Sequence, residues 1–191
     1  MLKRNLVGSL FRKHLKPDAL VIGGLGSAGR TWREQNAPQA TYYASDPMGV
    51  GVTMALGLAL AQPHREIFYI GGDGDLVMNL GCLLTLVGSG VSNLKIAIFD
   101  NRRYETGGGQ SLAAADHYSL SEIARHAGFP YAAAAADPAS VEVAIETFLA
   151  QPTLAFMALA IAMEASPYGP PPQWSQAEDR AVFMRKLAGE M

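Results

Sequence analysis

The chain contains 191 residues, of which 49% are hydrophobic and 17% charged, and its formal net charge is −2. This length fits a single domain with a full core, and the near-neutral charge gives no reason to expect nucleic acid as a partner. The high apolar content indicates buried parallel strands or a surface that a partner protein covers.

Signals for export or membrane insertion are missing from the sequence. Residues 1–14 are too interrupted by charge for a signal peptide, and the apolar run 154–163 is too short to cross a bilayer. We therefore expect no membrane association. Cys82 is the only cysteine, so an intrachain disulfide cannot form, and a cytoplasmic location is the expectation.

Strand-like and helix-like segments alternate along the chain. In the first half we expect helix 2–14, strand 18–24, a helix over 28–36, strand 41–44, helix 49–62, strand 67–71 and helix 76–89. In the second half we expect strand 94–99, a helix between Ser119 and Gly128, strand 131–135, a helix opened by Asp137-Pro138, strand 153–162, a stiff loop over 167–172 and a helix opened by Ser175. The pairs Ser119/Glu122 and Ser175/Glu178 have capping-box spacing, and Gly128 is a C-terminal stop.

This alternation predicts an α/β fold with three layers, α/β/α, around a mainly parallel sheet. We expect residues 1–191 to form one domain, with the helix of 1–16 and the loop and helix of 165–191 as extensions. Helix 49–62 is apolar nearly all round, which predicts that it is buried.

The residues best suited to ligand binding follow directly after predicted strands. Gly26 and Ser27 follow the first strand, Asp73 follows strand 67–71, and Asn101 follows strand 94–99. Because ligands of parallel sheets bind at the carboxyl ends of the strands, we expect these residues to meet at one edge.

Asp73 lies between Gly72 and Gly74, which let phosphate oxygens approach the backbone. Mg²⁺ takes oxygen ligands and usually only one or two carboxylates, with phosphates and water completing its shell. One Asp, one Asn amide oxygen and one backbone carbonyl would satisfy that demand. The alternative is an ordinary strand-to-helix turn in which Asp73 caps the helix.

The run from Gly72 to Gln110 combines Gly-Asp-Gly with Asp100-Asn101, and 25 residues separate Gly74 from Asp100. This spacing resembles the diphosphate-binding motif of the thiamine diphosphate (ThDP) enzymes. The whole run resembles the sulfopyruvate and phosphonopyruvate decarboxylases, which are ThDP-dependent 2-oxo acid decarboxylases. The likeness covers most of residues 20–150 and corresponds to the diphosphate-binding (PP) domain of these enzymes.

The resemblance implies a set of roles. Asp73, Asn101 and the carbonyl of Arg103 would hold Mg²⁺ on the diphosphate. Met48 would wedge the cofactor into its bent shape, and the carbonyl of Asp46 would accept a hydrogen bond from its aminopyrimidine. The full cofactor-binding set is Gly26, Ser27, Asp46, Met48, Gly72, Asp73, Gly74, Asp75, Asn101, Arg103, Tyr104 and Thr106. Met48 as a plain core residue and Ser27 as a plain helix cap stay open as alternatives.

Several residues depart from the family pattern. Asp75 replaces a small neutral residue, and a second carboxylate beside a diphosphate is electrostatically awkward. Arg102 and Arg103 replace small residues and could offset this charge or bind an anionic substrate. Gly107 replaces a Thr, and 107–109 is read as a flexible loop near the cofactor.

The resemblance also implies a partner. The glutamate that activates ThDP belongs, in these enzymes, to a separate pyrimidine-binding (PYR) domain, so no catalytic residue is expected in this chain. The chain resembles a β subunit of sulfopyruvate decarboxylase, which converts sulfopyruvate to sulfoacetaldehyde and carbon dioxide with an α subunit. We expect a hetero-oligomer that also self-associates. The alternatives are phosphonopyruvate decarboxylase, another ThDP-dependent decarboxylase or carboligase subunit, and a non-catalytic assembly subunit.

Other reactive side chains are weaker candidates. His14, His64, His117 and His126 show no metal-ligand spacing along the sequence. Cys82 lies within a helix among apolar neighbours, which does not favour a nucleophile.

Overall fold

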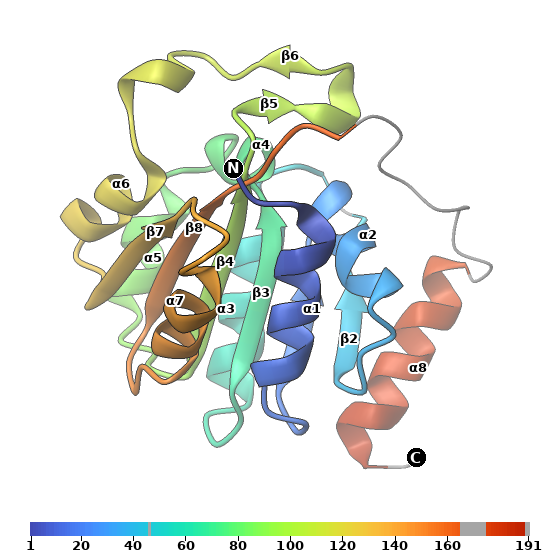
Figure 1. The fold of residues 1–191 in the computed structure, drawn as a ribbon. Helices are drawn as coiled ribbons and strands as arrows, with labels where there is room; N and C mark the ends of the chain where they lie inside the picture. The colour runs from blue at the N-terminus through green and yellow to red at the C-terminus, as the bar shows by residue number, and fades with distance from the viewer. Residues whose placement is uncertain (46, 165–174, 190–191) are drawn as a thin grey trace.

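The computed structural model describes residues 1–45, 47–164 and 175–189. Its centre is a six-stranded parallel sheet in the order β2-β1-β3-β4-β8-β7 (Figure 1). In chain order the strands are β1 Leu20–Gly23, β2 Ala40–Tyr43, β3 Ile67–Gly72, β4 Leu94–Asp100, β7 Tyr131–Ala135 and β8 Ala155–Ala160. The predicted α/β fold with a mainly parallel sheet is confirmed.

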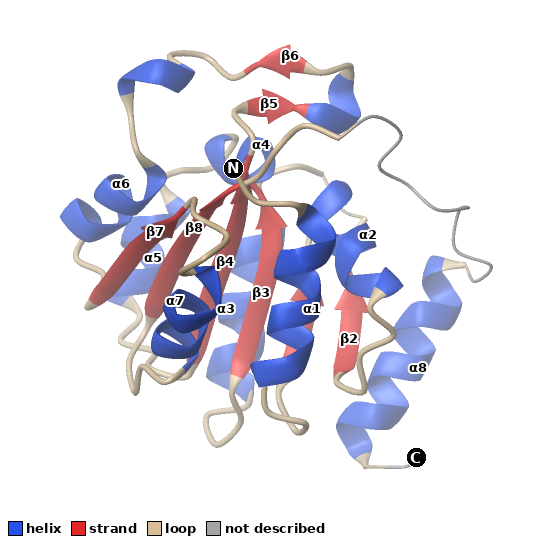
Figure 2. Ribbon diagram, viewed as in Figure 1, coloured by secondary structure: helices blue, strands red, loops and turns tan. Residues whose placement is uncertain are grey.

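Helices cover both faces of the sheet (Figure 2). One face carries α1 (Arg4–His14), α2 (Ser27–Glu34) and α7 (Val141–Leu149), and the other carries α3 (Gly51–Ala61), α5 (Cys82–Gly88) and α6 (Leu120–Ala127). The last helix, α8 (Gln176–Ala188), lies beside the edge strand β2, where Phe183 meets Tyr42 with ring centroids 5.9 Å apart. None of the described helices is long and apolar enough to cross a membrane.

The strands β1, β3, β4 and β8 are buried almost throughout, which explains their near-continuous apolar sequences. Phe11 of α1, Phe68 of β3 and Phe148 of α7 form an aromatic cluster on one side of the sheet. The alanine-rich segment β7 is held as an outer strand by its pairing with β8.

The predicted helix 76–89 is wrong in one respect, because it is two helices. α4 spans Asp73–Val77 and α5 spans Cys82–Gly88. Between the two helices, the Asn79 side chain donates from Nδ2 to the Gly49 carbonyl at 2.8 Å. Asn79 and Gly81 are also poor helix formers, so the tertiary contact interrupts a weak segment.

Two further boundaries differ from expectation. The helix predicted from Asp137-Pro138 begins at Val141, because Asp137 first forms a turn in which its side chain accepts from the Ala139 N–H at 3.1 Å. The stretch after β4 forms a hairpin, β5 (Arg103–Tyr104) with β6 (Gln110–Ser111), which the sequence did not predict. Its glycine turn has Gly108 and Gly109 at positive φ. The predicted loop 167–172 lies outside the described residues.

The N-terminal residues extend the sheet beyond the carboxyl end of β8. Leu2 pairs in parallel with Ile161, beyond the end of β8, and its N–H and carbonyl bond to the backbone of Ala160 and Ala162 at 2.8 Å each. This pairing places the first turn of α1 at the carboxyl edge of the strands, near α4 and β5 (Figure 1).

Tyr69, fully buried on β3, occupies a space that only glycines leave open. A Cβ on Gly71 would lie 2.2 Å from the Tyr69 hydroxyl, and a Cβ on Gly51 would lie 2.9 Å from its ring. The hydroxyl cannot move away freely, because it donates to the buried Asp75 at 2.6 Å.

We therefore predict that Gly71→Ala lowers the free energy of unfolding by about 3 kcal/mol or more, through overpacking. Gly57→Ala is the matched control, since its added Cβ would meet nothing within 4 Å in the exposed part of α3. The control should raise stability by roughly 0.5–1 kcal/mol through helix propensity. Urea denaturation measures both; equal effects of the two substitutions would contradict the packing described.

Candidate cofactor-binding site

The carboxyl ends of β1, β3 and β4 enclose a small cleft. Among the described residues, every predicted cofactor-binding position lines it: Gly26, Ser27, Met48, Gly72, Asp73, Gly74, Asp75, Asn101, Arg103, Tyr104 and Thr106. Asp46 lies outside the described residues. Leu25, Phe99 and Glu105 also line the cleft and were not predicted. The sequence pattern thus brings together residues from three strand ends and the loop before α3.

Asp73 is only 2% exposed and is the first residue of α4. Its Oδ1 accepts from the Gly74 N–H at 2.8 Å, and its Oδ2 accepts from the Arg102 N–H at 2.5 Å. Burial, together with the neighbouring carboxyl of Asp100, raises the pKa of Asp73 to about 7, against the effect of the two backbone donors. A plain helix cap would not have these features, because the capping position is Gly72.

Two further residues that line the cleft, Asn101 and Arg103, carry oxygen atoms that could bind a metal ion. Asn101 follows β4, and its Oδ1 accepts from the Arg103 N–H at 3.0 Å. The Arg103 carbonyl lies 3.5 Å from the position that a Cβ on Gly74 would occupy, so it faces the Gly-Asp-Gly turn. A carboxylate, an amide oxygen and a carbonyl therefore gather at one edge, and this is a donor set that suits a hard cation.

The buried hydroxyl of Tyr118 has no hydrogen-bond partner among the described residues. Burial raises the pKa of Tyr118, and the carboxylates of Asp73 and Asp100 add to the effect. The hydroxyl therefore lies within the electrostatic reach of these two acids. An unpaired buried hydroxyl within reach of two carboxylates is consistent with a site that binds a further polar group.

Asp75, which the sequence suggested would be an electrostatically awkward carboxylate beside a diphosphate, is buried and bonded within the protein. Its Oδ1 accepts from the Gly49 N–H and its Oδ2 accepts from the Tyr69 hydroxyl, both at 2.6 Å. Asn79 holds the Gly49 carbonyl from the other side. With both backbone groups bonded and φ at +89°, Gly49 fixes the loop that carries the neighbouring Met48.

Met48 and Ser27 can now be placed. Met48 is half-buried, lies outside the two core clusters and lines the cleft, so it is not a plain core residue. Ser27 is the first residue of α2; the capping position is Gly26, at φ +88°, and no side-chain cap is present. Ser27 therefore faces the cleft without acting as a helix cap.

The β5–β6 hairpin lies above the carboxyl ends of the strands (Figure 1), and Arg103, Tyr104 and Thr106 of it line the cleft. A Cβ on Gly74 would lie 2.8 Å from the Tyr104 ring, and a Cβ on Gly26 would lie 3.1 Å from the Thr106 methyl. Only glycines therefore allow the hairpin to approach so closely. The Arg103 side chain contributes to the hairpin itself, donating to the Gly109 carbonyl at 2.9 Å.

Arg102 lies at the same edge but its side chain turns away from Asp73. It has φ +62°, its guanidinium donates to the carbonyl of Ala115, and it lies 3.5 Å from the Asp116 carboxylate. In this arrangement the side chain of Arg102 serves the loop before α6.

A larger cavity of about 520 Å³ adjoins the cleft and shares Gly26, Met48 and Thr106 with it. Arg30 and Arg33 of α2 line it, together with the acidic Asp179 of α8. Arg33 donates to Asp179 of α8 at 2.5 Å and lies 3.7 Å from the centre of the Tyr43 ring. A volume of this size is in the range of small-molecule sites.

A second group of possible metal ligands lies among α1 and α7. His14, Glu142 and Glu146 have ligand atoms within 4.8 Å of one another, although no histidine spacing indicated it. Lys13 already contacts Glu142 at 2.7 Å and supplies positive charge there. The carboxyl edge of the sheet is the better cation site, because its acids are buried.

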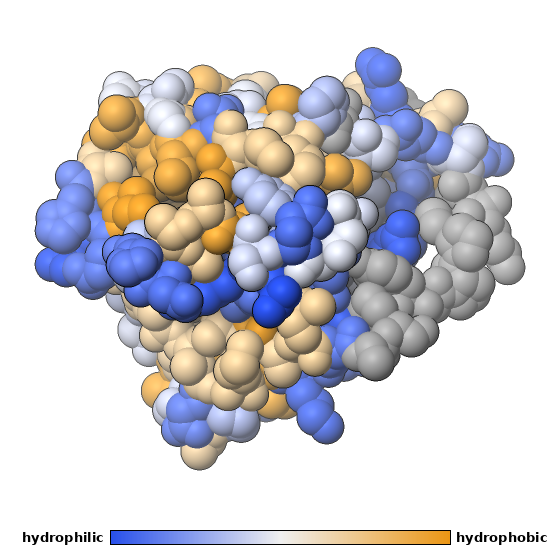
Figure 3. Space-filling model, turned by 90° about the horizontal axis from the view of Figure 1, so that it is seen from above, coloured by the Kyte–Doolittle hydropathy of each residue, from blue (hydrophilic) through white to orange (hydrophobic). Residues whose placement is uncertain are grey.

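The surface at the carboxyl edge is mixed, with hydrophobic residues gathered on one side and hydrophilic residues beside them (Figure 3). Two large exposed hydrophobic residues are sequence neighbours of the Asn79–Gly49 hydrogen bond. Val50 follows Gly49, and Met78 precedes Asn79. This edge therefore offers both a polar site and apolar surface next to it.

Comparison with known proteins agrees with this geometry. Residues 24–159 match the family "Thiamine pyrophosphate enzyme, C-terminal TPP binding domain". The chain is 38% identical over 112 residues to the sulfopyruvate decarboxylase subunit beta of Methanothermobacter thermautotrophicus, covering 59% of this chain and 60% of that one. It is 30% identical over 148 residues to the phosphonopyruvate decarboxylase of Streptomyces viridochromogenes, covering 76% and 36%. The matched part is thus less than two thirds of either relative.

Among solved structures, the ThDP-dependent 4-hydroxybenzoylformate decarboxylase of Rhodococcus jostii superposes with a TM-score of 0.68 at 19% identity, over 86% of this chain and 33% of the other. This likeness concerns the fold. Together with the family match over most of the chain, it leads to one conclusion: the chain belongs to the thiamine pyrophosphate (ThDP) enzymes and carries their C-terminal cofactor-binding domain.

Proposed function

We propose that the chain is the ThDP- and Mg²⁺-binding subunit of a cytoplasmic 2-oxo acid decarboxylase, with sulfopyruvate as the favoured substrate. The observation that carries the proposal is the convergence of Asp73, Asn101 and the Arg103 carbonyl in one cleft beside a cavity of about 520 Å³. The similarity to a sulfopyruvate decarboxylase subunit beta favours that substrate.

The metal proposal rests on charge as well as on donor type. A buried carboxylate next to a second carboxylate is unfavourable without a cation, and the raised pKa of Asp73 expresses this cost. Mg²⁺ would relieve it and would take one oxygen each from Asp73, Asn101 and Arg103. These residues would hold the diphosphate through the ion, while Gly26 and Ser27 would contact it from the end of β1.

ThDP, when bound, supplies an electron sink for release of carbon dioxide from a 2-oxo acid. The chain's own residues would bind and orient it. Met48, fixed through Gly49 by Asp75, would support the cofactor rings, and Tyr104 and Thr106 would shield the cleft from water. The adjoining cavity leaves room for the part of the ligand that the small cleft does not accommodate.

A second polypeptide is part of the proposal. Glu105 lines the cleft, but its two oxygens are already used by Arg4 at 2.8 Å and Asn101 at 3.0 Å. It is therefore poorly placed to activate a cofactor ring. A glutamate from a PYR-domain α subunit would serve instead, in a hetero-oligomer, as the designation "subunit beta" of the relatives suggests.

Arg30 and Arg33 line the cavity and favour a substrate with an acidic head group, with Arg33 already paired to Asp179. Phosphonopyruvate shares this character, and the relative named phosphonopyruvate decarboxylase makes it the second candidate. Both readings need the same cofactor site.

The chain mixed with the PYR-domain product of a neighbouring gene should release carbon dioxide from sulfopyruvate only when ThDP and Mg²⁺ are present. Asp73→Ala should abolish this turnover and weaken ThDP binding measured by calorimetry, because the metal loses its carboxylate. A panel with phosphonopyruvate and pyruvate tests the substrate. Release from no 2-oxo acid by a complex that binds ThDP would refute the decarboxylase proposal and favour an assembly subunit.

Mg²⁺ affinity should rise with pH up to about 7 to 8 and then level off, because protons compete for Asp73. In the metal-free protein the folded pKa of Asp73 lies above its unfolded value of 3.8, so the folded state binds the extra proton. Its contribution to stability is therefore present at low pH and is lost as pH rises from about 4 to 7.

Calorimetric titrations between pH 5.5 and pH 8.5, and urea denaturation with and without Mg²⁺, would check both effects. Asp73→Ala serves as the control, since it should flatten this part of the pH dependence. A wild-type Mg²⁺ affinity that is independent of pH would contradict the role given to Asp73.

Asp75→Ala should weaken ThDP binding about tenfold, because Gly49 and Met48 lose their anchor, and should destabilise the fold by about 1–3 kcal/mol. Tyr69→Phe is the matched control: it removes one of the two bonds to Asp75 but leaves the Gly49 contact. It should lower stability with little change in ThDP affinity. Similar losses of affinity in both variants would show that Asp75 does not act through the Met48 loop.

A further inference from the structure

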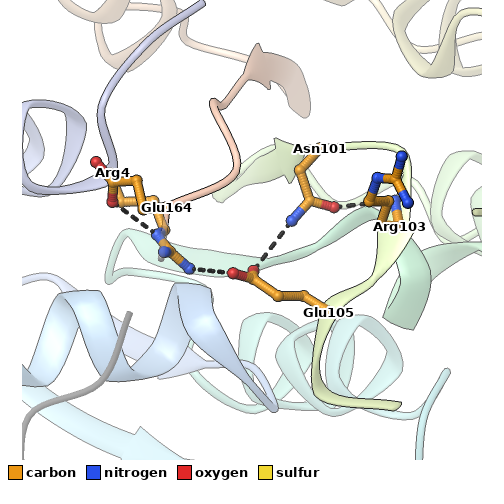
Figure 4. A network of polar contacts seen from close by, with 5 residues as sticks. All are labelled: Arg4, Asn101, Arg103, Glu105 and Glu164. Carbon is orange, nitrogen blue, oxygen red and sulfur yellow. Dashed lines mark hydrogen bonds and ion pairs between the residues drawn. The ribbon is translucent and has the colours of Figure 1, made fainter. Parts of the chain in front are cut away.

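Asn101 is held at both ends of its amide (Figure 4). Nδ2 donates to Glu105 Oε2 at 3.0 Å, and Oδ1 accepts the Arg103 N–H at 3.0 Å. An amide has one accepting and one donating end, and a carboxylate can only accept. The Glu105 carboxylate therefore selects the orientation in which Nδ2 faces it and Oδ1 faces the other way.

Glu105 is in turn held by Arg4. The Arg4 side chain is 3% exposed; its Nη1 lies 2.8 Å from Glu105, and its Nε lies 3.1 Å from Glu164. Figure 4 shows Glu105 between Arg4 and Asn101, so that the contacts form a continuous chain. A guanidinium has only donors, which means that it requires acceptors from both glutamates.

Local structure does not explain why Arg4 is there. It is the first residue of α1, where the helix dipole disfavours a positive charge. It comes to the carboxyl edge of the sheet through the Leu2–Ile161 pairing. Arg4 and Glu164 both lie outside the region 24–159 that matches the family model, whereas Glu105 lies within it.

We propose that Glu105, anchored by Arg4, is a positioning residue that turns the Oδ1 of Asn101 toward the cation. The proposal rests on the proposed Mg²⁺ site and adds to it a device that sets the amide orientation. Outer groups of this kind orient metal ligands, and their loss typically costs about 10–100-fold in metal affinity.

Glu105→Gln is the critical variant. The new amide must present its oxygen to Arg4, which has no acceptor, and so its nitrogen faces Asn101. Asn101 must then rotate and present Nδ2 to the metal. Mg²⁺ affinity, titrated by calorimetry into the complex with the PYR-domain subunit in the presence of excess ThDP, should fall about 10–100-fold.

The order of the variants separates positioning from simple structural support. Glu105→Ala leaves the Arg103 N–H to hold Oδ1 of Asn101, so Mg²⁺ affinity should fall less than in Glu105→Gln, by several-fold. A merely structural role would give the opposite order, because Gln is the closer mimic of Glu. Glu164→Gln is the matched control: it contacts Arg4 but not Asn101, and it should change Mg²⁺ affinity by less than about threefold, since its amide oxygen still accepts from Arg4.

A double variant makes the test decisive. In Arg4→Met/Glu105→Gln, the Gln oxygen is released from Arg4 and can accept from Asn101 again, so Mg²⁺ affinity should recover at least several-fold relative to Glu105→Gln alone. Thermal unfolding establishes that each variant is folded at the titration temperature. The absence of recovery, or a stronger effect of Ala than of Gln, overturns the proposal. Failure of the wild-type complex to bind Mg²⁺ with ThDP would instead refute the metal site itself.

Discussion

The buried carboxylate at the end of β3 is the constraint on which the rest of the site depends. Asp73 is almost fully buried beside Asp100, and two backbone N–H groups do not offset that environment, because the pKa remains raised to about 7. An acid in such a place is costly to the isolated fold. The parallel sheet creates the cost, since it delivers the ends of β3 and β4 side by side.

The two acids of the Gly-Asp-Gly-Asp turn divide their tasks. Asp73 accepts from the backbone N–H groups of Gly74 and Arg102, whereas Asp75 accepts from the Gly49 N–H and the hydroxyl of Tyr69. One short turn therefore supports both the polar end of the site and the loop that carries Met48. The glycines around Tyr69 allow this, because they admit a large ring into the sheet next to the site.

Much of the fold and of the candidate site could be predicted from local sequence patterns. The apolar runs marked the strands, and the Gly-Asp-Gly and Asp-Asn pairs marked two strand ends that prove to be neighbours. The break between α4 and α5 was missed because helix periodicity continues across it, while the contact that interrupts it joins Asn79 to distant Gly49. The hairpin was missed because its strands have two residues each.

Long-range polar contacts were the least predictable part. Glu105 offered little signal, because Asp100, Arg102 and Arg103 are charged residues of the same motif. Arg4 had none, since its partners are 101 and 160 residues away in sequence. Likewise the acid at position 75 looked unfavourable for a diphosphate until its hydrogen-bond donors were placed.

The pairing of Leu2 with Ile161 has a practical consequence for dissecting the molecule. A fragment cut at the borders of the family match would keep the Asp73 and Asn101 motifs but lose α1 and the strand extension that receives it. Phe68 and Phe148 would then be exposed to water. Glu105 in the cleft would lose its contact with Arg4. The region that matches the family model, 24–159, is therefore smaller than the part of the chain that packs as one core, and an expressed fragment should also include α1.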